Sequence, residues 1–352
     1  MTNCKVLADS PTPKLTSNSA SVPVVSLAQA NEANPASAAL NQFFTRIGYT
    51  GPAAGELVGV AYSGGVDSTA LLLAAVALWP GKVCALHIHH GLQDAADEFQ
   101  RVCGELCSGL NIPLYAQRVD ARPGSGMSPE DAARRARYHA LAQLAQQQRL
   151  KAVLLGHHAN DQVETLLLAL SRGAGLPGLS AMPEVLERGG TRFYRPLLQT
   201  APEPLRDWLQ QTQTRFIDDP SNLDLRYTRN RIRAELLPVL AAAFPQFRQT
   251  FARSAQHAAQ GQRLLAELAA EDLLVVGHPP VIRLLHTLSD ARQTNVLRHW
   301  LSQCHQTAPT AAQMAQLLNQ VAACRTRGHQ INIKVGAGQV RRQGAQLAYV
   351  AR

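Results

Sequence analysis

The chain has 352 residues, of which 46% are hydrophobic and 17% charged, and this length suits two globular domains better than one. No apolar stretch reaches the roughly 20 residues of a membrane-spanning helix, and no collagen-like or heptad period appears, so transmembrane and fibrous proteins are excluded. Six cysteines are too few for a disulfide scaffold. Residues 1–20 lack the basic start and apolar core of a signal peptide, so we expect a cytoplasmic protein without a membrane partner.

The net charge of +9 rests on arginine, because the 34 basic residues comprise 29 Arg and 5 Lys. The planar guanidinium group suits phosphate and stacks on bases, so this surplus favours a nucleic-acid partner. A soluble protein from an arginine-rich proteome has the same composition, and charge alone leaves that alternative open. A homodimer also stays open, because nothing in the sequence determines the oligomeric state.

Residues 1–35 are rich in Ser, Ala, Asn and Pro without a helical or strand period, and we predict a disordered tail. Strands and helices then alternate. We expect strands at 57–62, 82–89, 114–119 and 152–155, and helices at 69–78, 95–110, 129–148 and 161–170. This alternation is typical of an α/β fold with a parallel sheet and helices on both faces.

The pattern changes near residue 235. Residues 240–272 predict one or two connecting helices, and further helices are expected at 290–303 and 310–324. Three short strand-like runs follow at 330–335, 339–342 and 346–350, with Gly336, Gly338 and Gly344 as hairpin turns. We therefore divide the chain into a tail (1–35), an α/β domain (36–240), a helical linker (241–261) and a small α+β C-terminal domain (262–352).

A glycine-rich turn, Ser63-Gly64-Gly65-Val66-Asp67-Ser68, joins the first expected strand to the first helix. Glycines let the backbone approach a phosphate, and the helix N-terminus offers free N–H groups. A carboxylate beside phosphate is repulsive unless it holds a Mg²⁺ ion, so Asp67 indicates a metal contact. The turn matches neither the Walker A loop nor G-x-G-x-x-G, and a plain strand-to-helix turn is the alternative.

This turn resembles the PP-loop of the ATP pyrophosphatase superfamily, whose members cleave ATP to AMP and pyrophosphate on a Rossmann-like domain of the adenine nucleotide α-hydrolase type. A lone S-G-G-x-D-S motif identifies only the superfamily. Together with later segments, it resembles the tRNA(Ile)-lysidine synthase family, densely over residues 57–240 and more loosely beyond. The later segments are residues 87–92, 133–138, 155–165, 171–175, 195–198, 218–222 and 227–233.

The resemblance implies a tRNA-processing ligase that joins free L-lysine to carbon 2 of the wobble cytidine in tRNA(Ile) with a CAU anticodon. The cytidine oxygen would first attack the α-phosphate of ATP and release pyrophosphate, and the lysine ε-amine would then expel AMP. The product, lysidine, changes codon reading from AUG to AUA and amino-acid identity from Met to Ile. ATP and Mg²⁺ are the implied substrate and cofactor, and the C-terminal domain would bind the tRNA.

The resemblance also assigns roles to residues. Asp67, His157, Asp161 and Arg229 would be catalytic, and Asp67 would hold the metal. Asp161, Glu164 and Arg229 would bind lysine, whose amine must lose a proton before it attacks. The residues expected to contact ATP are Ala61, Tyr62, Ser63, Gly64, Gly65, Val66, Asp67, Ser68, His87, Ile88, Arg137, Gly156 and His157.

Several assignments have structural alternatives. Asp161 and Glu164 also fit a helix-capping pair with Asp161 as N-cap, and the adjacent His157 and His158 also suggest zinc. The arginines at 229, 231 and 233 cannot all face one ligand at helical spacing. Residues 218–222, which form part of the active-site wall in the family, also fit an ordinary turn.

Two other functions stay open, namely a PP-loop enzyme of the thiolation type and a catalytically silent tRNA-binding protein on the same fold. The absence of C-x-x-C argues against the first, and the intact acidic and arginine motif residues argue against the second. Two features depart from the family pattern. Asn160 precedes Asp161 where many members have two aspartates, and residues 262–352 leave room for one C-terminal domain where some members have two.

Overall fold

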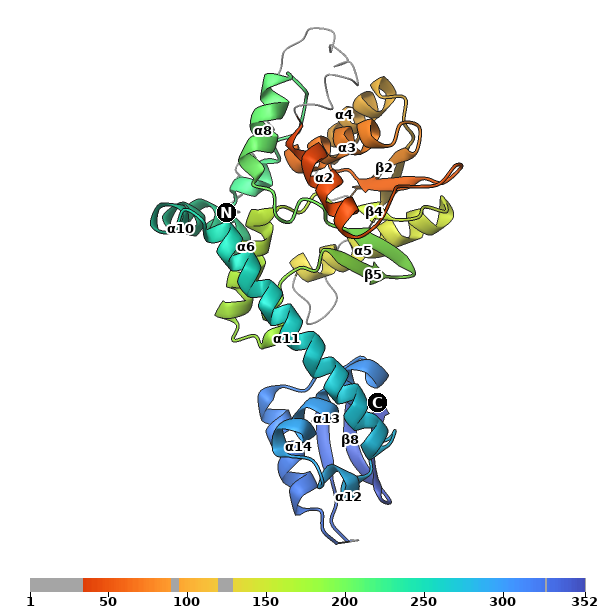
Figure 1. Cartoon of the computed structure of the whole chain (residues 1–352), viewed down its shortest axis with the longest axis vertical. Helices are drawn as coiled ribbons and strands as arrows, with labels where there is room; N and C mark the ends of the chain where they lie inside the picture. Colours follow the sequence, from red (N-terminus) through yellow and green to blue (C-terminus); the bar gives the residue numbers. More distant parts are fainter. Residues whose placement is uncertain (1–33, 90–94, 120–128, 327, 352) are drawn as a thin grey trace, which may run out of the picture. The chain divides into compact units, whose positions relative to one another are not determined.

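The computed structural model describes residues 34–89, 95–119, 129–326 and 328–351 (Figure 1). These residues form two compact units: residues up to Ala174 with Ala181–Ala255 form unit 1, and Gly175–Ser180 with the residues from Gln256 onward form unit 2. Most of the expected tail, residues 1–33, lies outside the described residues, as do His90, Gly91 and Leu92 of the motif series. The boundaries at 240 and 261 stay predictions.

The expected tail is wrong for its last two residues, because a helix begins there. Asn34 is the N-cap of a helix that starts at Pro35, and its side chain accepts a hydrogen bond from Ala36 N at 2.9 Å. The Asn34 amide also donates to Ala70 O at 2.9 Å, which ties the start of this helix to the next one. Proline at the first helical position favours this start, a pattern that the sequence analysis overlooked.

Unit 1 contains each strand and helix expected between residues 57 and 170, with ends within three residues of those predicted. The helix α2, the hairpin of β5 and β6, and α8 were not predicted. Its strands are β1 (Val58–Ala61), β2 (Val83–His89), β3 (Leu114–Arg118), β4 (Val153–Leu154), β5 (Val185–Arg188) and β6 (Thr191–Tyr194). Its helical elements are α2 (Pro35–Arg46), α3 (Val66–Leu78), α4 (Ala95–Gly109), α5 (Pro129–Gln147), α6 (Ala159–Ser171), α8 (Pro202–Gln211), η1 (Pro220–Leu223), α9 (Thr228–Arg231), the π-helical turn η2 (Ile232–Leu236) and α10 (Leu237–Ala243).

The strands form one six-stranded sheet in the order β3-β2-β1-β4-β6-β5. All neighbouring pairs are parallel except β5 and β6, which form an antiparallel hairpin at the edge. Gly189 and Gly190 close this hairpin with φ of +55° and +68°, which residues other than glycine rarely adopt. The predicted α/β class is therefore confirmed, with an antiparallel edge strand added to an otherwise parallel sheet.

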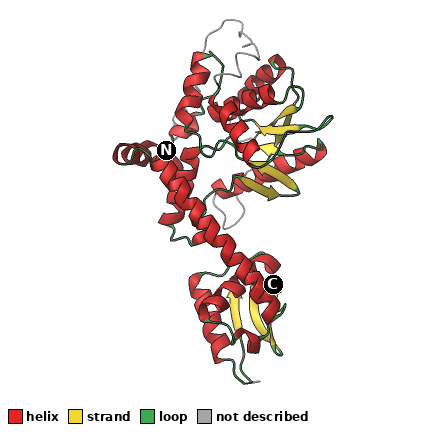
Figure 2. Ribbon diagram, in the orientation of Figure 1, coloured by secondary structure: helices red, strands yellow, loops and turns green. Residues whose placement is uncertain are grey.

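Helices cover both faces of this sheet (Figure 2). Val83 and Ala85 of β2 join the core cluster that contains residues of α2, α3 and α8, whereas Cys84 and Leu86 join the cluster with α5. Successive side chains of a strand point to opposite faces, so a strand buried on both sides reads as a continuous apolar run. This double burial explains why β2 shows no alternating pattern in the sequence.

The strand order indicates where a ligand site should lie in unit 1. The connection from β1 crosses through α3 to β2 on one side, whereas β4 pairs with the other side of β1, so the direction of winding changes between β1 and β4. In open α/β sheets the ligand binds at this point, beyond the carboxyl ends of the strands. The loops there touch: a Cβ atom on Gly156, just after β4, would lie 3.1 Å from Ser68 N.

Unit 2 begins within the single long helix α11 (Phe247–Val276), where one or two helices were expected. A three-stranded antiparallel sheet, β7-β8-β9, packs with the helices around a core that includes Trp300, Leu317 and Val340. The remaining elements are α7 (Leu176–Leu179), α12 (Ile282–Leu285), α13 (Asp290–His305), α14 (Ala311–Ala323), β7 (Asn332–Val335), β8 (Gly338–Gln343) and β9 (Gln346–Ala351). The expected small α+β fold is confirmed. None of the described helices is long and apolar enough to cross a membrane.

Candidate active site

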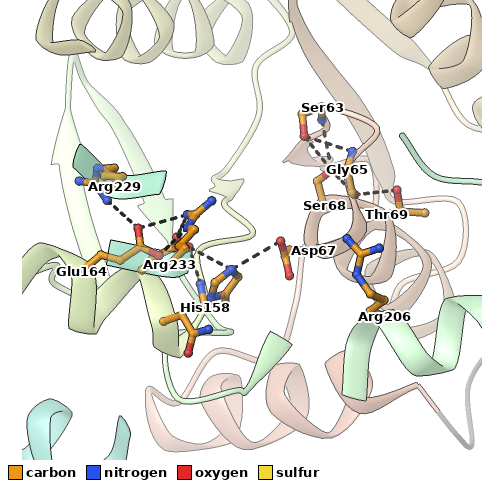
Figure 3. A network of polar contacts seen from close by, with 12 residues as sticks. Ser63, Gly65, Asp67, Ser68, Thr69, His158, Glu164, Arg206, Arg229 and Arg233 are labelled. Atoms are coloured by element: carbon orange, nitrogen blue, oxygen red, sulfur yellow. Dashed lines mark hydrogen bonds and ion pairs between the residues drawn. The ribbon is translucent and has the colours of Figure 1, made fainter. Parts of the chain in front are cut away.

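The glycine-rich turn runs from the end of β1 into α3 and is held by its own hydroxyl groups (Figure 3). Ser68 Oγ donates to Gly65 O at 3.0 Å and lies 3.1 Å from Ser63 Oγ. Thr69 Oγ1 donates to Gly65 O at 2.9 Å. The first N–H groups of a helix have no partner within it, so these contacts shape a turn whose amides can bind an anion.

A replacement of Gly64 would be strained at this turn. Its φ is +85°, and a Cβ atom would lie 2.4 Å from Ile217 Cδ1. Ile217 N also donates to Gly64 O at 2.9 Å, so the strand-like segment before residue 218 lies directly against the turn. Asp218, the first residue of the motif 218–222, pairs with Arg206 Nη2 at 2.7 Å. The structure therefore places this motif beside the expected phosphate site.

The carboxyl ends of β1 and β2 lie side by side, with Ala61 in register with Leu86. The Tyr62 and His87 side chains are buried, and His87 Nδ1 donates to Tyr62 O at 2.9 Å. Burial lowers the pKa of His87, so the ring is neutral and its Nδ1 carries the proton, since a carbonyl only accepts. Among the expected ATP contacts, Tyr62 has both backbone groups engaged, since its N–H donates to Leu86 O at 2.8 Å and its carbonyl accepts from His87, while Ile88 is only partly buried.

A continuous polar network joins the glycine-rich turn to α6 and to the segment after α9 (Figure 3). His158 Nε2 lies 3.7 Å from Asp67 Oδ2 and 3.7 Å from Asp161 Oδ2. Asp161 Oδ1 then accepts a hydrogen bond from Arg233 Nη2 at 2.8 Å. Residues from three separate parts of the sequence thus meet in one network.

Glu164 lies at the far end of this network and is fully buried. Arg233 Nε donates to its Oε1 at 2.6 Å, and Arg233 Nη2 lies 3.2 Å from its Oε2. Arg229 Nη1 adds a contact of 3.4 Å to Oε2. Asp161 and Glu164 are three residues apart on α6, and their shared partner Arg233 holds both carboxylates on one side of the helix.

Burial and charge shift the pKa values of the three carboxyl groups differently. Burial raises the pKa of Asp67, and the nearby Asp161 raises it further. Burial also raises the pKa of Glu164 and outweighs the opposite effect of Arg233. For Asp161, burial acts upward, but its interactions with His158 and Arg233 prevail and lower its pKa. Asp161 is therefore the carboxylate most firmly held in its charged form.

Several polar atoms at this site are buried without a hydrogen-bond partner among the described residues. They are Asp67 Oδ1, His157 Nδ1 and His158 Nδ1. A buried polar atom without a partner is costly, and the great majority of such atoms in folded proteins are paired. Three of them around one turn indicate that this site is completed by something other than the chain itself.

His157 faces a group of cationic side chains. Burial, together with the charges of Arg195, Arg134 and Arg137, lowers the pKa of His157 to about 3, so the ring is neutral. Arg137 therefore acts electrostatically on His157, while its expected contact with ATP stays a prediction. Arg195, from the motif 195–198, is a core residue instead: it is 1% exposed and donates to Tyr138 Oη at 2.7 Å.

The structure also bears on the helix-cap and metal-site alternatives for the residues at the start of α6. The N-cap of α6 is His158, so Asp161 as N-cap is wrong; Asp161 stands at the third helical position, where its Oδ2 accepts from His158 N at 3.0 Å. Asn160 turns toward α11 and accepts from Arg248 Nε at 2.5 Å, which explains why replacing an aspartate there leaves the Asp161 contacts intact. Among the described residues, no group of three or more His, Cys, Asp or Glu side chains is placed to hold a metal ion.

Sequence reasoning missed two members of the network, His158 and Arg233. Arg229 and Arg233 are four residues apart and share a helical face, while Arg231 between them is exposed. That spacing was available in the sequence and would have selected the right pair. His158 carried no such signal, because a histidine in the first turn of a helix is more often a cap than a link between two carboxylates.

Comparisons with known proteins agree with this site. Residues 35–240 match the family model of the PP-loop domain, and residues 282–347 match that of the TilS substrate binding domain. The chain is 61% identical over 317 residues to the tRNA(Ile)-lysidine synthase of Polaromonas naphthalenivorans, and the match covers 90% of this chain and 95% of that protein. It is 42% identical to the tRNA(Ile)-lysidine synthase of Burkholderia pseudomallei, over 76% of this chain but 56% of that longer relative.

A solved structure shares the fold of unit 1. The U34-tRNA thiolase NcsA from Methanococcus maripaludis, with its [4Fe-4S] cluster, matches with a TM-score of 0.54 and 12% identity. The match covers 63% of this chain and 77% of that one. At this identity the likeness concerns the fold alone.

Proposed function

The chain belongs to the tRNA(Ile)-lysidine synthase family, and we propose that the two half-reactions of that enzyme divide along the polar network of unit 1. The enzyme is a ligase that uses ATP to join lysine to the wobble cytidine of tRNA(Ile) with a CAU anticodon. In our proposal, the end of the network at Asp67 serves adenylation of the cytidine. The end at Glu164 serves the attack by lysine.

ATP lies against the glycine-rich turn in this proposal. The amides of Gly65 and the first turn of α3 face the phosphates, and the positive end of the helix dipole favours their charge. Gly156 lies close to Ser68, so the loop after β4 borders the glycine-rich turn on a second side. His157, neutral because of burial, donates a hydrogen bond to the α-phosphate from Nδ1, the ring nitrogen without a partner among the described residues.

Asp67 fits a magnesium contact. Its Oδ1 is buried and has no partner in the described part of the chain, and Mg²⁺ is commonly bound by one or two carboxylates together with substrate phosphates. When bound, Mg²⁺ neutralises charge that develops on the phosphates as pyrophosphate leaves. His158 Nε2 lies 3.7 Å from Asp67 Oδ2, and this contact orients the carboxylate so that Oδ1 is the atom left for the metal.

Lysine binds at the carboxylate pair of α6 in this proposal. Asp161 stays ionised because His158 and Arg233 lower its pKa despite burial, so it supplies the charge that attracts an ammonium group. Glu164 has a raised pKa and is suited to accept the proton that the amine must lose before it attacks. Arg229 orients Glu164 through its contact at 3.4 Å.

Unit 2 is the part that we assign to tRNA recognition, because the substrate binding domain of the family matches residues 282–347. The arginine surplus of the chain supports a polyanionic partner. Free L-lysine, ATP and tRNA are all cytoplasmic substrates, and we place the reaction in that compartment.

The thiolation alternative finds no support in the three buried cysteines of unit 1. Enzymes that handle sulfur need reactive thiolates, but burial raises the pKa of Cys84, Cys103 and Cys107 to about 12 each. Such thiols are inert at neutral pH. The likeness to the thiolase NcsA therefore extends to the fold and not to this chemistry.

The carrying observation is that Asp67, Asp161 and Glu164, from two separate motifs, meet in one network at the switch point of the sheet. The test is incorporation of labelled lysine into a tRNA(Ile) transcript with a CAU anticodon, in the presence of ATP and Mg²⁺. The methionine elongator tRNA, which has the same anticodon, is the matched control. Labelling of the isoleucine transcript alone supports the proposal; ATP cleavage to AMP and pyrophosphate without labelling contradicts it and points to another nucleophile.

A further inference from the structure

Both carboxylates assigned to lysine are already occupied by arginine in this structure. Arg233 bonds to Oδ1 of Asp161 and to both oxygens of Glu164, at 2.8, 2.6 and 3.2 Å. The remaining contacts of the pair come from His158 N and Arg229. Arg233 and Arg229 thus contact both oxygens of Glu164, and its side chain is 0% exposed, so no path from solvent leads to it past these arginines.

An incoming ε-ammonium cannot reach Glu164 in this arrangement. It would also meet a local charge that is already balanced, since two carboxylates face two guanidinium groups. Adding a second cation beside Arg233 is unfavourable, because like charges repel at contact distance and a partly buried site screens them only in part. Lysine binding at this pair therefore requires Arg233 to leave.

Arg233 is placed to leave. Its side chain is 38% exposed, unlike the fully buried Glu164 that it contacts. It lies in the π-helical turn η2, Ile232–Leu236, and single π-helical turns within helices are frequent at functional sites. The motion needed is a side-chain swing, not an opening of the core.

An alternative partner lies on the side of the glycine-rich turn. The guanidinium of Arg233 interacts electrostatically with Asp67 as well as with Asp161 and Glu164. A phosphate held by the turn would offer Arg233 a planar, bidentate acceptor that competes with the carboxylate pair. We propose that Arg233 is an internal substitute for the lysine ammonium, and that a nucleotide phosphate bound at the turn draws it away and opens the lysine site.

This proposal rests on the proposed function and adds an order of binding to it. Before nucleotide binds, Arg233 keeps both carboxylates charged, paired and closed to lysine. After nucleotide binds, the Arg233 guanidinium has left the two carboxylates, and the ε-ammonium group of lysine can take its place beside them. Arg233 is thus a positioning residue that couples two sites, and the coupling is reciprocal, so lysine also tightens nucleotide binding.

The test is equilibrium binding of lysine to the full-length protein, measured by calorimetry with and without α,β-methylene ATP and Mg²⁺. For the unaltered protein we expect the dissociation constant of lysine to fall by about 10-fold or more when the analogue is present, a typical size for such coupling. In Arg233→Met the pair is no longer occupied, and lysine should bind with the same affinity in both conditions. Arg231→Met, an exposed arginine two positions away, is the matched control and should behave like the unaltered protein.

Two outcomes overturn the proposal: lysine binding to the unaltered protein that does not depend on the analogue, or Arg233→Met that keeps the full dependence. If Arg233→Met is unfolded by circular dichroism, Arg233→Lys replaces it. That variant keeps the charge but loses the bidentate fork, so the dependence should shrink without vanishing, and unchanged dependence contradicts the proposal. Lysine incorporation into the tRNA(Ile) transcript by the unaltered protein is measured in parallel. Product formation without coupling rejects only the role of Arg233, whereas absence of both product and lysine binding rejects the proposed function.

Discussion

The His158 ring and the Asp67 carboxylate lie 3.7 Å apart, and this contact joins the glycine-rich turn to helix α6. The same Nε2 atom lies 3.7 Å from Asp161 Oδ2, so one imidazole stands between a carboxylate of the glycine-rich turn and a carboxylate of α6 (Figure 3). Beyond Asp161 the network continues through Arg233 to Glu164. The two ends are chemically different, and variants at each end should separate the two half-reactions.

Asp67→Asn should abolish release of pyrophosphate, because the amide cannot carry the charge that holds Mg²⁺. The fold should survive. Burial raises the pKa of Asp67 in the folded protein, so its charged form is disfavoured there and the stability it costs grows as pH rises above its unfolded value. At neutral pH we therefore expect the midpoint of thermal unfolding of Asp67→Asn to equal or exceed that of the unaltered protein, with a gain of up to about 1 kcal/mol.

Measurements of pyrophosphate release and of thermal unfolding on the same preparation check both parts. A variant that loses activity together with several degrees of thermal stability would show that Asp67 supports the fold, and the metal role would lose its main argument. Asp67→Glu is a useful companion, since it keeps the charge but moves it by one methylene. Partial activity is expected there.

Glu164→Gln should reduce lysine transfer more than pyrophosphate release. The amide keeps part of the hydrogen bonding to Arg233 and Arg229 but cannot accept a proton from lysine. We expect a loss of about 100-fold in transfer to adenylated tRNA, the usual order for a general base. Glu164→Ala is less informative, because it leaves buried cations unpaired and so destabilises the fold by about 3–5 kcal/mol.

The measurement follows each half-reaction separately, with pyrophosphate released in the absence of lysine and labelled lysine transferred in a single turnover. Equal losses in the two steps would contradict a role for Glu164 at the lysine site. In that case the contacts to both arginines would be structural.

Gly64→Ala should destabilise the protein and prevent ATP cleavage. Alanine at φ +85° is strained by about 1–2 kcal/mol, and its Cβ would lie 2.4 Å from Ile217 Cδ1, which adds about 1–3 kcal/mol of overpacking. Gly81→Ala is the matched control, since Gly81 has φ +72° with nothing within 4 Å of the added atom, so only the backbone strain remains. Chemical denaturation of both variants gives the difference. Equal costs would mean that the Ile217 side chain yields freely.

Much of unit 1 could be predicted from the sequence because short apolar runs alternate with longer helical stretches, an order typical of a parallel sheet. The hairpin of β5 and β6 escaped notice because Val185 and Leu186 are followed by charged residues at the edge of the sheet, where one side of a strand meets water. Helix α2 was lost in a polar stretch whose composition resembles disorder, although Asn34 and Pro35 form a standard helix start. Local caps decide this case, and composition alone misses them.

The candidate site was predicted at the level of its motifs but not of its contacts. A motif shows which residues gather, as with Asp67, Asp161 and Glu164. It does not show that Arg233 already fills the space between two of them, because that depends on the π-helical turn η2 and on the depth at which Glu164 is buried. Pairings between distant segments follow from tertiary structure, and single-sequence patterns carry no record of them.

The stability of unit 1 should depend on pH through His157. Burial lowers the pKa of this ring from 6.5 to about 3, so the folded protein holds it neutral while the unfolded chain binds a proton as pH falls through 6.5. The contribution of the neutral ring to the free energy of unfolding is therefore fully present above pH 6.5 and is lost progressively as the pH falls toward 3. Between pH 7.5 and pH 5 the loss from this group alone reaches about 2 kcal/mol, since each pKa unit corresponds to about 1.4 kcal/mol.

His157→Gln removes the titrating ring and should flatten this dependence, whereas His139→Gln, at an exposed position of α5, should leave it unchanged. Urea denaturation of the three proteins at pH 7.5 and pH 5 provides the comparison, with the difference between the two pH values as the readout. Other groups titrate in this range in all three proteins and cancel in that difference. If His157→Gln retains the full pH dependence, the ring is already accessible to protons in the folded protein, and its assignment as a neutral partner of the α-phosphate must be abandoned.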